Sequence, residues 1–127
     1  MKREIKFRYR YTDGKSWIFQ SFTLEQIING EPFEVLSDNP MLKNYKYDGE
    51  DQYTRLKDKE GTELYEGDIV QCFRSGKKSK FDIYFIKYEY NSFFMAQEKS
   101  DTKMDSIWFY EFKVIGNIYQ HPHLIKQ

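Results

Sequence analysis

The stretch Gln52–Val70, QYTRLKDKEGTELYEGDIV, contains the closest succession of strand and turn signals in the sequence. Tyr53–Leu56 is a β-prone run, and the polar turn Lys57–Gly61 follows it without a gap. Gly61 can adopt the positive φ that a bulged hairpin requires. Thr62–Tyr65 then returns as a partner strand. This part of the stretch predicts a β-hairpin.

The end of the same stretch predicts a second reversal of the chain at Glu66-Gly67-Asp68. Gly67 permits a tight corner, and the Asp68 carboxylate can accept hydrogen bonds from nearby backbone N–H groups. A Gly-Asp pair before an apolar strand is similar to the corner found in many small SH3-like barrels. We therefore expect a small barrel from about Asp51 onward.

Downstream, Ile69–Phe73 and Phe81–Tyr90 flank the basic segment Arg74–Lys80 and predict a hairpin with a basic tip. Both faces of the second strand are apolar or aromatic, which predicts a strand covered on two sides. Glu98–Asp105 is interpreted as a polar loop. Three more strands are expected, over Phe93–Gln97, Ser106–Phe109 and Phe112–Tyr119, with a bulge or close backbone approach at Gly116-Asn117.

Upstream, Arg3–Tyr11 alternates strictly between apolar and charged residues, which predicts a strand with one solvent-facing side. Thr12–Lys15 contains the Asp-Gly pair of a tight turn, and Trp17–Phe22 is the expected partner strand. The N-terminal part of the chain thus begins with a hairpin.

A capping box at Thr23–Gln26 predicts a helix of one or two turns, with Leu24, Ile27 and Ile28 facing inward. Asn29-Gly30 offers a left-handed stop. Phe33–Leu36 is a strand candidate, and Met41–Asp51 is interpreted as a surface loop with one weak strand. We expect one domain over 1–127, with an N-terminal subregion of hairpin and helix (1–50) and a barrel-like subregion (51–127).

Three blocks of the sequence resemble the YopX family of small phage and prophage proteins. They are REIKFR at 3–8, the central run 53–70, similar to YTGLKDKNGKEIYEGDIV, and FKVIGNIYQHPHLI at 112–125, similar to VIGNIYENPELL. The resemblance implies a mainly β fold and no established molecular activity. Arg55 replaces the family's usual glycine, so a positive φ at that position would strain this chain.

Composition supports a mainly β protein and restricts its function. Aromatic residues make up 19% of the 127 residues, which favours half-buried strands. The 20 basic and 20 acidic residues cancel, so no long-range field steers the whole molecule toward nucleic acid. The single Cys72 excludes an internal disulfide and suits a reducing compartment. With no apolar stretch of membrane length and no signal-peptide core, we expect the cytoplasm of a bacterial host.

Three groups of residues are candidates for chemistry, and each has a simpler structural interpretation. His121 and His123 are too few ligands for a structural zinc site and are interpreted as solvated tail residues. Cys72 lies in an apolar strand, which favours a buried, unreactive thiol over a nucleophile. The central carboxylates are interpreted as solvated turn charges with Asp68 as a local cap: Glu60, Glu63, Glu66 and Asp68. We expect no enzyme activity and no cofactor.

Binding is the remaining class of function. We expect a non-catalytic module that binds a host or phage protein, with self-association as a further prediction. The alternative is a small barrel that binds nucleic acid through basic residues and stacked aromatic rings. The candidate residues lie in the first strand and around the basic hairpin: Lys6, Arg8, Arg10, Arg74, Lys77, Lys78, Lys80, Tyr84, Tyr88 and Tyr90.

Overall fold

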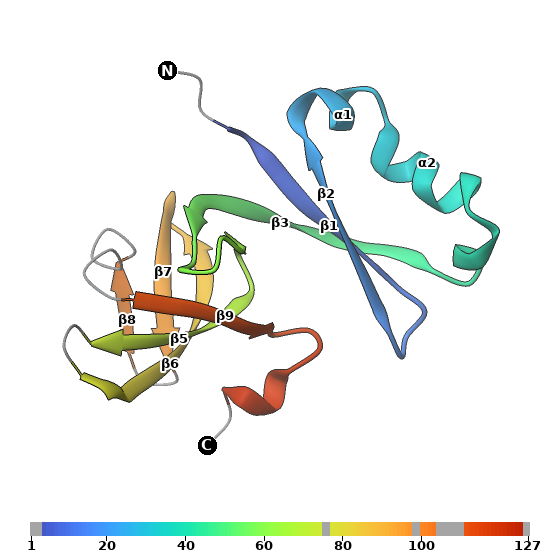
Figure 1. Ribbon diagram of the computed structural model, residues 1–127. Helices are drawn as coiled ribbons and strands as arrows, with labels where there is room; N and C mark the ends of the chain where they lie inside the picture. Colours follow the sequence, from blue (N-terminus) through green and yellow to red (C-terminus); the bar gives the residue numbers. More distant parts are fainter. Residues whose placement is uncertain (1–3, 75–76, 98–99, 104–110, 126–127) are drawn as a thin grey trace. The chain divides into compact units, whose positions relative to one another are not determined.

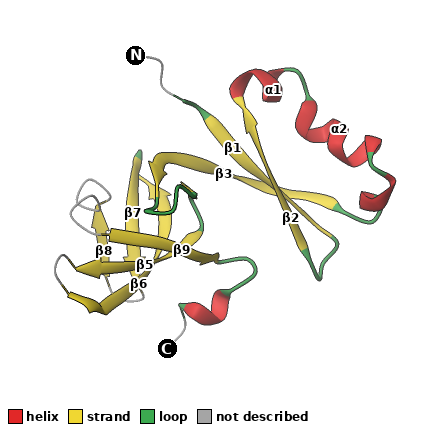
Figure 2. Cartoon of the chain, viewed as in Figure 1, coloured by secondary structure: helices red, strands yellow, loops and turns green. Residues whose placement is uncertain are grey.

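The computed structural model describes residues 4–74, 77–97, 100–103 and 111–125 (Figure 1). The chain divides into two compact units, Met1–Tyr53 and Thr54–Gln127. Antiparallel strands dominate both units, which confirms the mainly β prediction (Figure 2). None of the helices in the described ranges is long and apolar enough to cross a membrane.

The N-terminal unit is built on the predicted hairpin of β1 (Lys6–Thr12) and β2 (Trp17–Thr23). The Asp13 carboxylate accepts hydrogen bonds from the N–H groups of Lys15 and Ser16 at 2.9 and 2.8 Å. Gly14 has a φ of +96°, a conformation that glycine adopts without strain. The Asp-Gly turn chemistry therefore fixes the hairpin locally.

The alternation of β1 gives the unit its core. Phe7, Tyr9 and Tyr11 lie on one face, and Tyr9 and Tyr11 are buried with Phe22 of β2. The Tyr11 hydroxyl donates to the Pro32 carbonyl oxygen at 2.6 Å, which pairs its buried polar atom. The expected inward face of the first strand is confirmed.

Helix α1 (Leu24–Ile28) begins at the predicted capping box, in which Thr23 and Gln26 each bond the other's backbone N–H. Only Ile27 packs against the core. Leu24 and Ile28 are exposed, so the expectation that they face inward is wrong. A helix of five residues is too short to bury a full apolar stripe.

A second helix, α2 (Glu31–Asp38), replaces the expected strand at Phe33–Leu36, so the prediction of one helix is also wrong. Gly30 precedes it with a φ of +80°, and Pro32 lies in its first turn, where the missing N–H has no helical partner. Val35 and Leu36 pack on the buried face of the sheet. A short 3-10 turn, η1 (Pro40–Leu42), follows.

Strand β3 (Lys46–Lys57) replaces most of the surface loop expected over Met41–Asp51. It pairs antiparallel with β1, with a register shift between Arg10 and Tyr11, so the N-terminal unit has the strand order β2-β1-β3. Asp51 is 1% exposed although it ends an acidic run. The polar character of the run predicts a loop, but its counter-charges Arg8 and Arg10 lie on β1, about 40 residues earlier, and allow Asp51 to be buried in a strand.

In the C-terminal unit the central motif folds as predicted. The end of β3 and β4 (Glu63–Tyr65) lie side by side, and Gly61 in their turn has a φ of +85°. Asp68 is buried, and its carboxylate accepts the Tyr65 N–H at 2.8 Å. The local cap proposed for Asp68 is confirmed.

The second sheet has the order β8-β7-β6-β5-β9. Its strands are β5 (Asp68–Arg74), β6 (Lys77–Glu89), β7 (Ser92–Gln97), β8 (Ser100–Lys103) and β9 (Glu111–Asn117). Strand β8 lies within the segment expected to be a loop, whereas the strand expected at Ser106–Phe109 falls outside the described residues. We expected a small SH3-like barrel, but in the described ranges this order ends at β8 and β9, and no closed barrel is detected.

The core of this unit joins β4 to four strands of the sheet, through Leu64, Val70, Cys72, Ile86, Met95 and Phe112. Strand β9 carries the predicted irregularity: its register with β5 shifts where Ile69 faces Gly116 and Val70 faces Val114. This shift leaves Ile115 as the extra residue of a bulge. The chain then turns into a final 3-10 turn, η3 (Pro122–Leu124).

Candidate functional site

The N-terminal unit carries an aromatic patch in which Phe33 and Tyr47, both exposed, contact the buried Tyr9. Phe33 of α2 lies edge-on to Tyr9 at 6.4 Å and to Tyr47 of β3 at 5.7 Å between ring centroids. Tyr9 is buried below, whereas Phe33 is 57% exposed. The patch is thus anchored on the core and open to solvent.

Other exposed apolar side chains lie in the same unit. Ile28, at the end of α1, and Met41, in η1, are 77% and 87% exposed. Of the seven large apolar side chains exposed in the described ranges, six belong to the N-terminal unit: Ile5, Leu24, Ile28, Phe33, Met41 and Tyr47. Tyr90 is the seventh. Among the residues whose exposure the structure describes, large exposed apolar side chains are therefore concentrated in the N-terminal unit.

A groove of about 530 Å³ lies beside α2 in the same unit. Phe22 and Val35 contribute its apolar part, and Gln20 and Gln26 its amides. Its acidic side comes from α2, whose carboxylates at spacings of three and four residues share one flank: Glu31, Glu34 and Asp38. The groove is open and carries negative charge.

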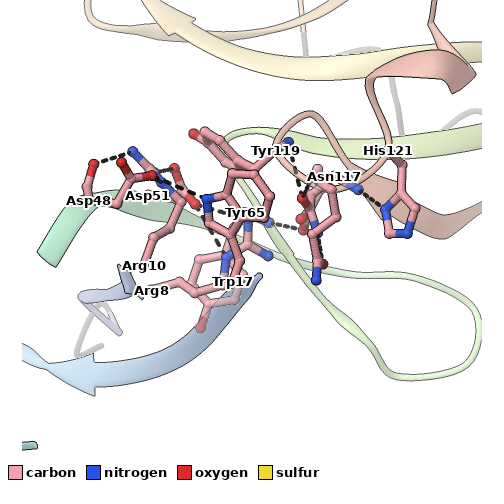
Figure 3. Close-up of polar contacts among 11 residues, drawn as sticks. Arg8, Arg10, Trp17, Asp48, Asp51, Tyr65, Asn117, Tyr119 and His121 are labelled. Atoms are coloured by element: carbon pink, nitrogen blue, oxygen red, sulfur yellow. Dashed lines mark hydrogen bonds and ion pairs between the residues drawn. The ribbon is translucent and has the colours of Figure 1, made fainter. Parts of the chain in front are cut away.

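The opposite face of β1 carries the arginines of the predicted basic patch. Arg8 bonds Asp51 through Nε and Nη2, at 3.3 and 3.0 Å, and Arg10 bonds the other carboxylate oxygen of Asp51 (Figure 3). Arg10 also reaches the side chain and carbonyl of Asp48, and the Trp17 indole N–H donates to Asp48. Two arginines and two carboxylates therefore balance in charge.

Lys6 and Arg8 make further contacts that hold them on the strand. The Lys6 ammonium pairs with Glu4 at 2.8 Å and lies 5.0 Å from the centroid of the Tyr53 ring. The Arg8 guanidinium lies 4.9 Å from the Phe19 ring. Cations that are paired and stacked in this way are costly to redirect toward phosphate.

The basic residues of the β5–β6 hairpin belong to the other unit. Arg74 ends β5 and faces Lys77 of β6 in the backbone register. Lys78 and Lys80 follow in β6. The side chains of these four residues, and residues 75–76 entirely, lie outside what the structure describes. No described contact therefore tests their role.

The three candidate tyrosines occupy different environments. Tyr84 is half-buried and packs against the C-terminal core. Tyr88 is half-buried and lies 4.8 Å from Phe93 between ring centroids. Tyr90 is 89% exposed because it leaves the strand for a two-residue turn with Asn91, both at positive φ. Tyr90 therefore does not extend the face of Tyr84 and Tyr88.

Three of the candidates for chemistry, Cys72, Glu60 and Glu63, make contacts within the C-terminal unit. Cys72 is buried, and this burial, with the charge of Asp82, raises its pKa to about 12, so the thiol is protonated at neutral pH. Glu63 accepts from the Tyr65 hydroxyl at 3.0 Å, and Glu60 pairs with Lys113 at 3.5 Å. These contacts suit structural residues.

His121 is not a solvated tail residue, contrary to expectation, because its Nδ1 accepts the Asn117 N–H at 3.2 Å. His123 is exposed, and the two rings are 6.1 Å apart between centroids. No group of three or more His, Cys, Asp or Glu side chains suited to a metal ion occurs in the described ranges. The pair by itself is too small a ligand set for zinc.

Sequence reasoning missed the residues that organise both faces of the N-terminal unit. Asp51 was assigned to a loop, and Phe33 and Tyr47 were not considered as a surface pair. One signal was available: Arg8 and Arg10 share a strand face, and the acidic run 48–51 offered counter-charges for a neighbouring strand.

Comparison with known proteins identifies the family of this chain. No curated protein matches the chain significantly. A family model described as YopX protein matches residues 6–126. This match spans nearly the whole chain, including the central motif and the β9 block that carried the resemblance. The chain therefore belongs to the YopX family.

Proposed function

We propose that this protein is a non-catalytic binding module that recognises another protein through the aromatic patch and the other exposed apolar residues of the N-terminal unit. The observation that carries the proposal is the exposure of Phe33, Tyr47 and Met41 on one unit. Exposed apolar patches mark interaction sites, and anchored aromatic rings contribute strongly to protein interfaces.

The contacts that anchor the patch support this function. Phe33 and Tyr47 come from a helix and a strand, and both rings contact Tyr9, which is fixed in the core. Side chains held in this way lose little conformational freedom on binding. A partner that covers the patch would bury aromatic surface at a low entropic cost.

The partner we propose is a phage or host protein in the bacterial cytoplasm. The single, buried and protonated Cys72 suits a reducing compartment. Family membership supports a role in phage or prophage biology without giving the partner's identity.

Affinity capture from a lysogenic or infected host tests the proposal. Wild-type protein is compared with Phe33→Ser and Met41→Ser, and with Tyr90→Ser as the control, because Tyr90 is an aromatic residue of the other unit and is 89% exposed. We expect a partner that binds wild type and Tyr90→Ser but is lost with the other two variants. Identical capture by all four proteins would overturn the proposal.

Nucleic-acid binding is the second candidate, and one observation favours it. Four basic residues, Arg74, Lys77, Lys78 and Lys80, occur within seven positions on the two strands of one hairpin. The test is electrophoretic mobility of single-stranded and duplex DNA and RNA at low salt, where phosphate contacts are strongest. Binding that is lost in Lys77→Glu/Lys78→Glu would support this candidate, and unchanged mobility with wild type would end it.

A further inference from the structure

The helical part of the N-terminal unit is acidic and apolar. Residues 16–42, which include α1, α2 and η1, contain no lysine or arginine. Their acids are Glu25, Glu31, Glu34 and Asp38. Most of the large exposed apolar side chains of the unit come from the same segment: Leu24, Ile28, Phe33 and Met41. This segment therefore combines net negative charge with exposed apolar area.

The groove beside α2 gathers this chemistry in one concave place. Its lining combines the three acids of α2 with apolar side chains: Glu31, Glu34, Asp38, Phe22 and Val35. In the described ranges no salt bridge includes the three acids, whereas Asp48 and Asp51 of β3 pair with the arginines of β1. The negative charge of the groove is therefore not balanced by a described ion pair, unlike that of β3.

A cation with an aliphatic stem suits this lining better than a metal ion does. Lysine and arginine side chains place their methylene groups on apolar surface and keep the charged head among carboxylates and water. The acids are not gathered tightly enough for metal coordination, since no group of three or more candidate ligands is found in the described part of the chain. The groove is thus suited to a basic side chain.

Helix α2 lies between the groove and the aromatic patch. Successive residues of a helix are turned by about 100°, so Phe33 and Glu34 lie on adjoining flanks. Phe33 contacts Tyr47 and Tyr9, whereas Glu34 lines the groove. A helix with its side chains is about 10–12 Å across. One segment of a partner that covers Phe33 can therefore reach the carboxylates as well.

We propose that the binding segment of the partner protein is both basic and apolar, and that it places lysine or arginine side chains in the groove while its apolar side chains cover Phe33. This inference rests on the proposed function and adds the chemistry of the partner. Charge complementarity selects the occupant, because a segment with four acids and no base attracts cationic partners and repels acidic ones.

Binding of synthetic peptides to the full chain tests the proposal. The probe is a short fluorescent peptide that repeats lysine and leucine, and the comparison peptides repeat glutamate and leucine or lysine and serine. Glu34→Gln/Asp38→Asn removes two exposed charges of the groove. Glu89→Gln/Glu111→Gln is the matched control, because it removes two exposed charges from the other unit. Circular dichroism checks that each variant is folded.

Fluorescence anisotropy measures the affinities. We expect the lysine-leucine peptide to bind wild type and the control variant alike, and to bind the groove variant about fivefold more weakly. This binding should weaken as salt is added. The glutamate-leucine peptide should not bind, and the lysine-serine peptide should bind more weakly because it leaves Phe33 uncovered. Equal affinity of the groove and control variants, or equal binding of the acidic peptide, would overturn the proposal.

A free polyamine and a second copy of the chain are the alternative occupants. Displacement of the peptide by an equal concentration of spermidine would assign the groove to a polyamine. A dimer formed by wild type and lost in the groove variant, measured by light scattering, would assign it to a second copy. Either result would overturn the proposal.

Capture from the host lysate remains the separate test of the proposed function. If capture is lost with Phe33→Ser and Met41→Ser but peptide binding ignores the groove charges, only the basic partner segment is ruled out. Identical capture by all the proteins would instead overturn the proposed function, on which this inference depends.

Discussion

Arg55 holds a backbone conformation that suits glycine better than arginine. Its φ is +71°, in the left-handed region, and its side chain is exposed. The left-handed conformation costs an L-residue roughly 1–2 kcal/mol relative to the right-handed one. A glycine at this position would adopt the same φ without this cost.

Replacing Arg55 by glycine should therefore stabilise the protein. We expect Arg55→Gly to raise the free energy of unfolding by about 1 kcal/mol, because relief of strain outweighs the added freedom of the unfolded chain. Urea denaturation measures the difference. Arg55→Ala is the control, since it removes the same side chain but keeps Cβ and should give no comparable gain. Equal stability of the two variants would show that the positive φ is not strained.

At the scale of elements, Asp58 connects the β3–β4 turn to β9. Its Oδ1 accepts the N–H groups of Glu60 and Thr62, both at 2.9 Å, and its Oδ2 accepts the Val114 N–H at 3.0 Å. Burial raises the pKa of this carboxyl, but the three N–H donors and the Lys113 charge outweigh burial, so the pKa is lowered. Folding therefore favours the charged carboxylate of Asp58.

Asp58→Asn should cost about 2–3 kcal/mol at pH 7, because one side-chain oxygen becomes an N–H donor that faces another donor. The folded pKa is lowered, so wild-type stability from this group is complete above the unfolded value of about 3.9 and is lost as the pH falls through the folded value. The variant should show a weaker loss in acid. Urea denaturation at pH 7 and near pH 3 measures both effects.

Glu60→Gln provides the matched control for Asp58. Glu60 lies in the same turn and forms an exposed pair with Lys113, which should contribute less than about 1 kcal/mol. If Asp58→Asn proved as stable as Glu60→Gln at neutral pH, the hydrogen bonds from Asp58 to the turn and β9 would contribute nothing to the free energy of unfolding.

Gly116 and His121 form a second connection, at the end of β9. A Cβ added at Gly116 would lie 2.6 Å from His121 Nδ1 and 2.9 Å from its Cγ. Gly116→Ala should therefore destabilise the protein by about 1–3 kcal/mol through overpacking. Chemical denaturation measures the cost.

A double-mutant cycle identifies the cause of that cost. His121→Ala removes the ring and the acceptor of the Asn117 N–H, so it should also be destabilising. In the double variant the alanine at 116 no longer meets a ring, and its added cost should fall below about 0.5 kcal/mol. If the costs of the two single variants simply added up in the double variant, the cost of Gly116→Ala would come from backbone strain and not from the His121 ring.

The elements that could be predicted from the sequence are those fixed by neighbouring residues. The turn at Asp13-Gly14, the capping box at Thr23 and the Asp68 corner each form through hydrogen bonds within a few positions. Helix α2 was missed because Phe33–Leu36 is a short apolar run that suits a helix or a strand. Its flanking signals, Gly30 and Pro32, were interpreted as a stop rather than a start.

The candidate sites were predicted less well than the strands because they depend on distant partners. Arg8 and Arg10 were correctly placed on one strand face, but their pairing with Asp51 joins segments about 40 residues apart. Phe33 and Tyr47 meet only after α2 folds back over the sheet. Exposure and charge compensation of this kind follow from the tertiary fold.

At the scale of the whole molecule, each unit contains buried groups that ionise only at high pH. In the N-terminal unit, burial and the neighbouring Tyr9 raise the pKa of Tyr11 from 10.0 to about 12. In the C-terminal unit, burial and Asp82 raise the pKa of Cys72 from 9.0 to about 12. Each unit therefore contains a group whose pKa in the folded protein lies above its ordinary value.

Stability should therefore fall steadily between about pH 9 and pH 12. The unfolded chain releases these protons before the folded protein does, so the folded state binds more protons in this range and the free energy of unfolding decreases as the pH rises. Cys72→Ala removes the earliest-titrating group and should lessen the decrease that begins near pH 9. Tyr11→Phe should lessen the part that begins near pH 10. Urea denaturation monitored by circular dichroism at pH 7, 9 and 10.5 measures these slopes, and a free energy of unfolding that stays constant over this range would contradict the burial of both groups.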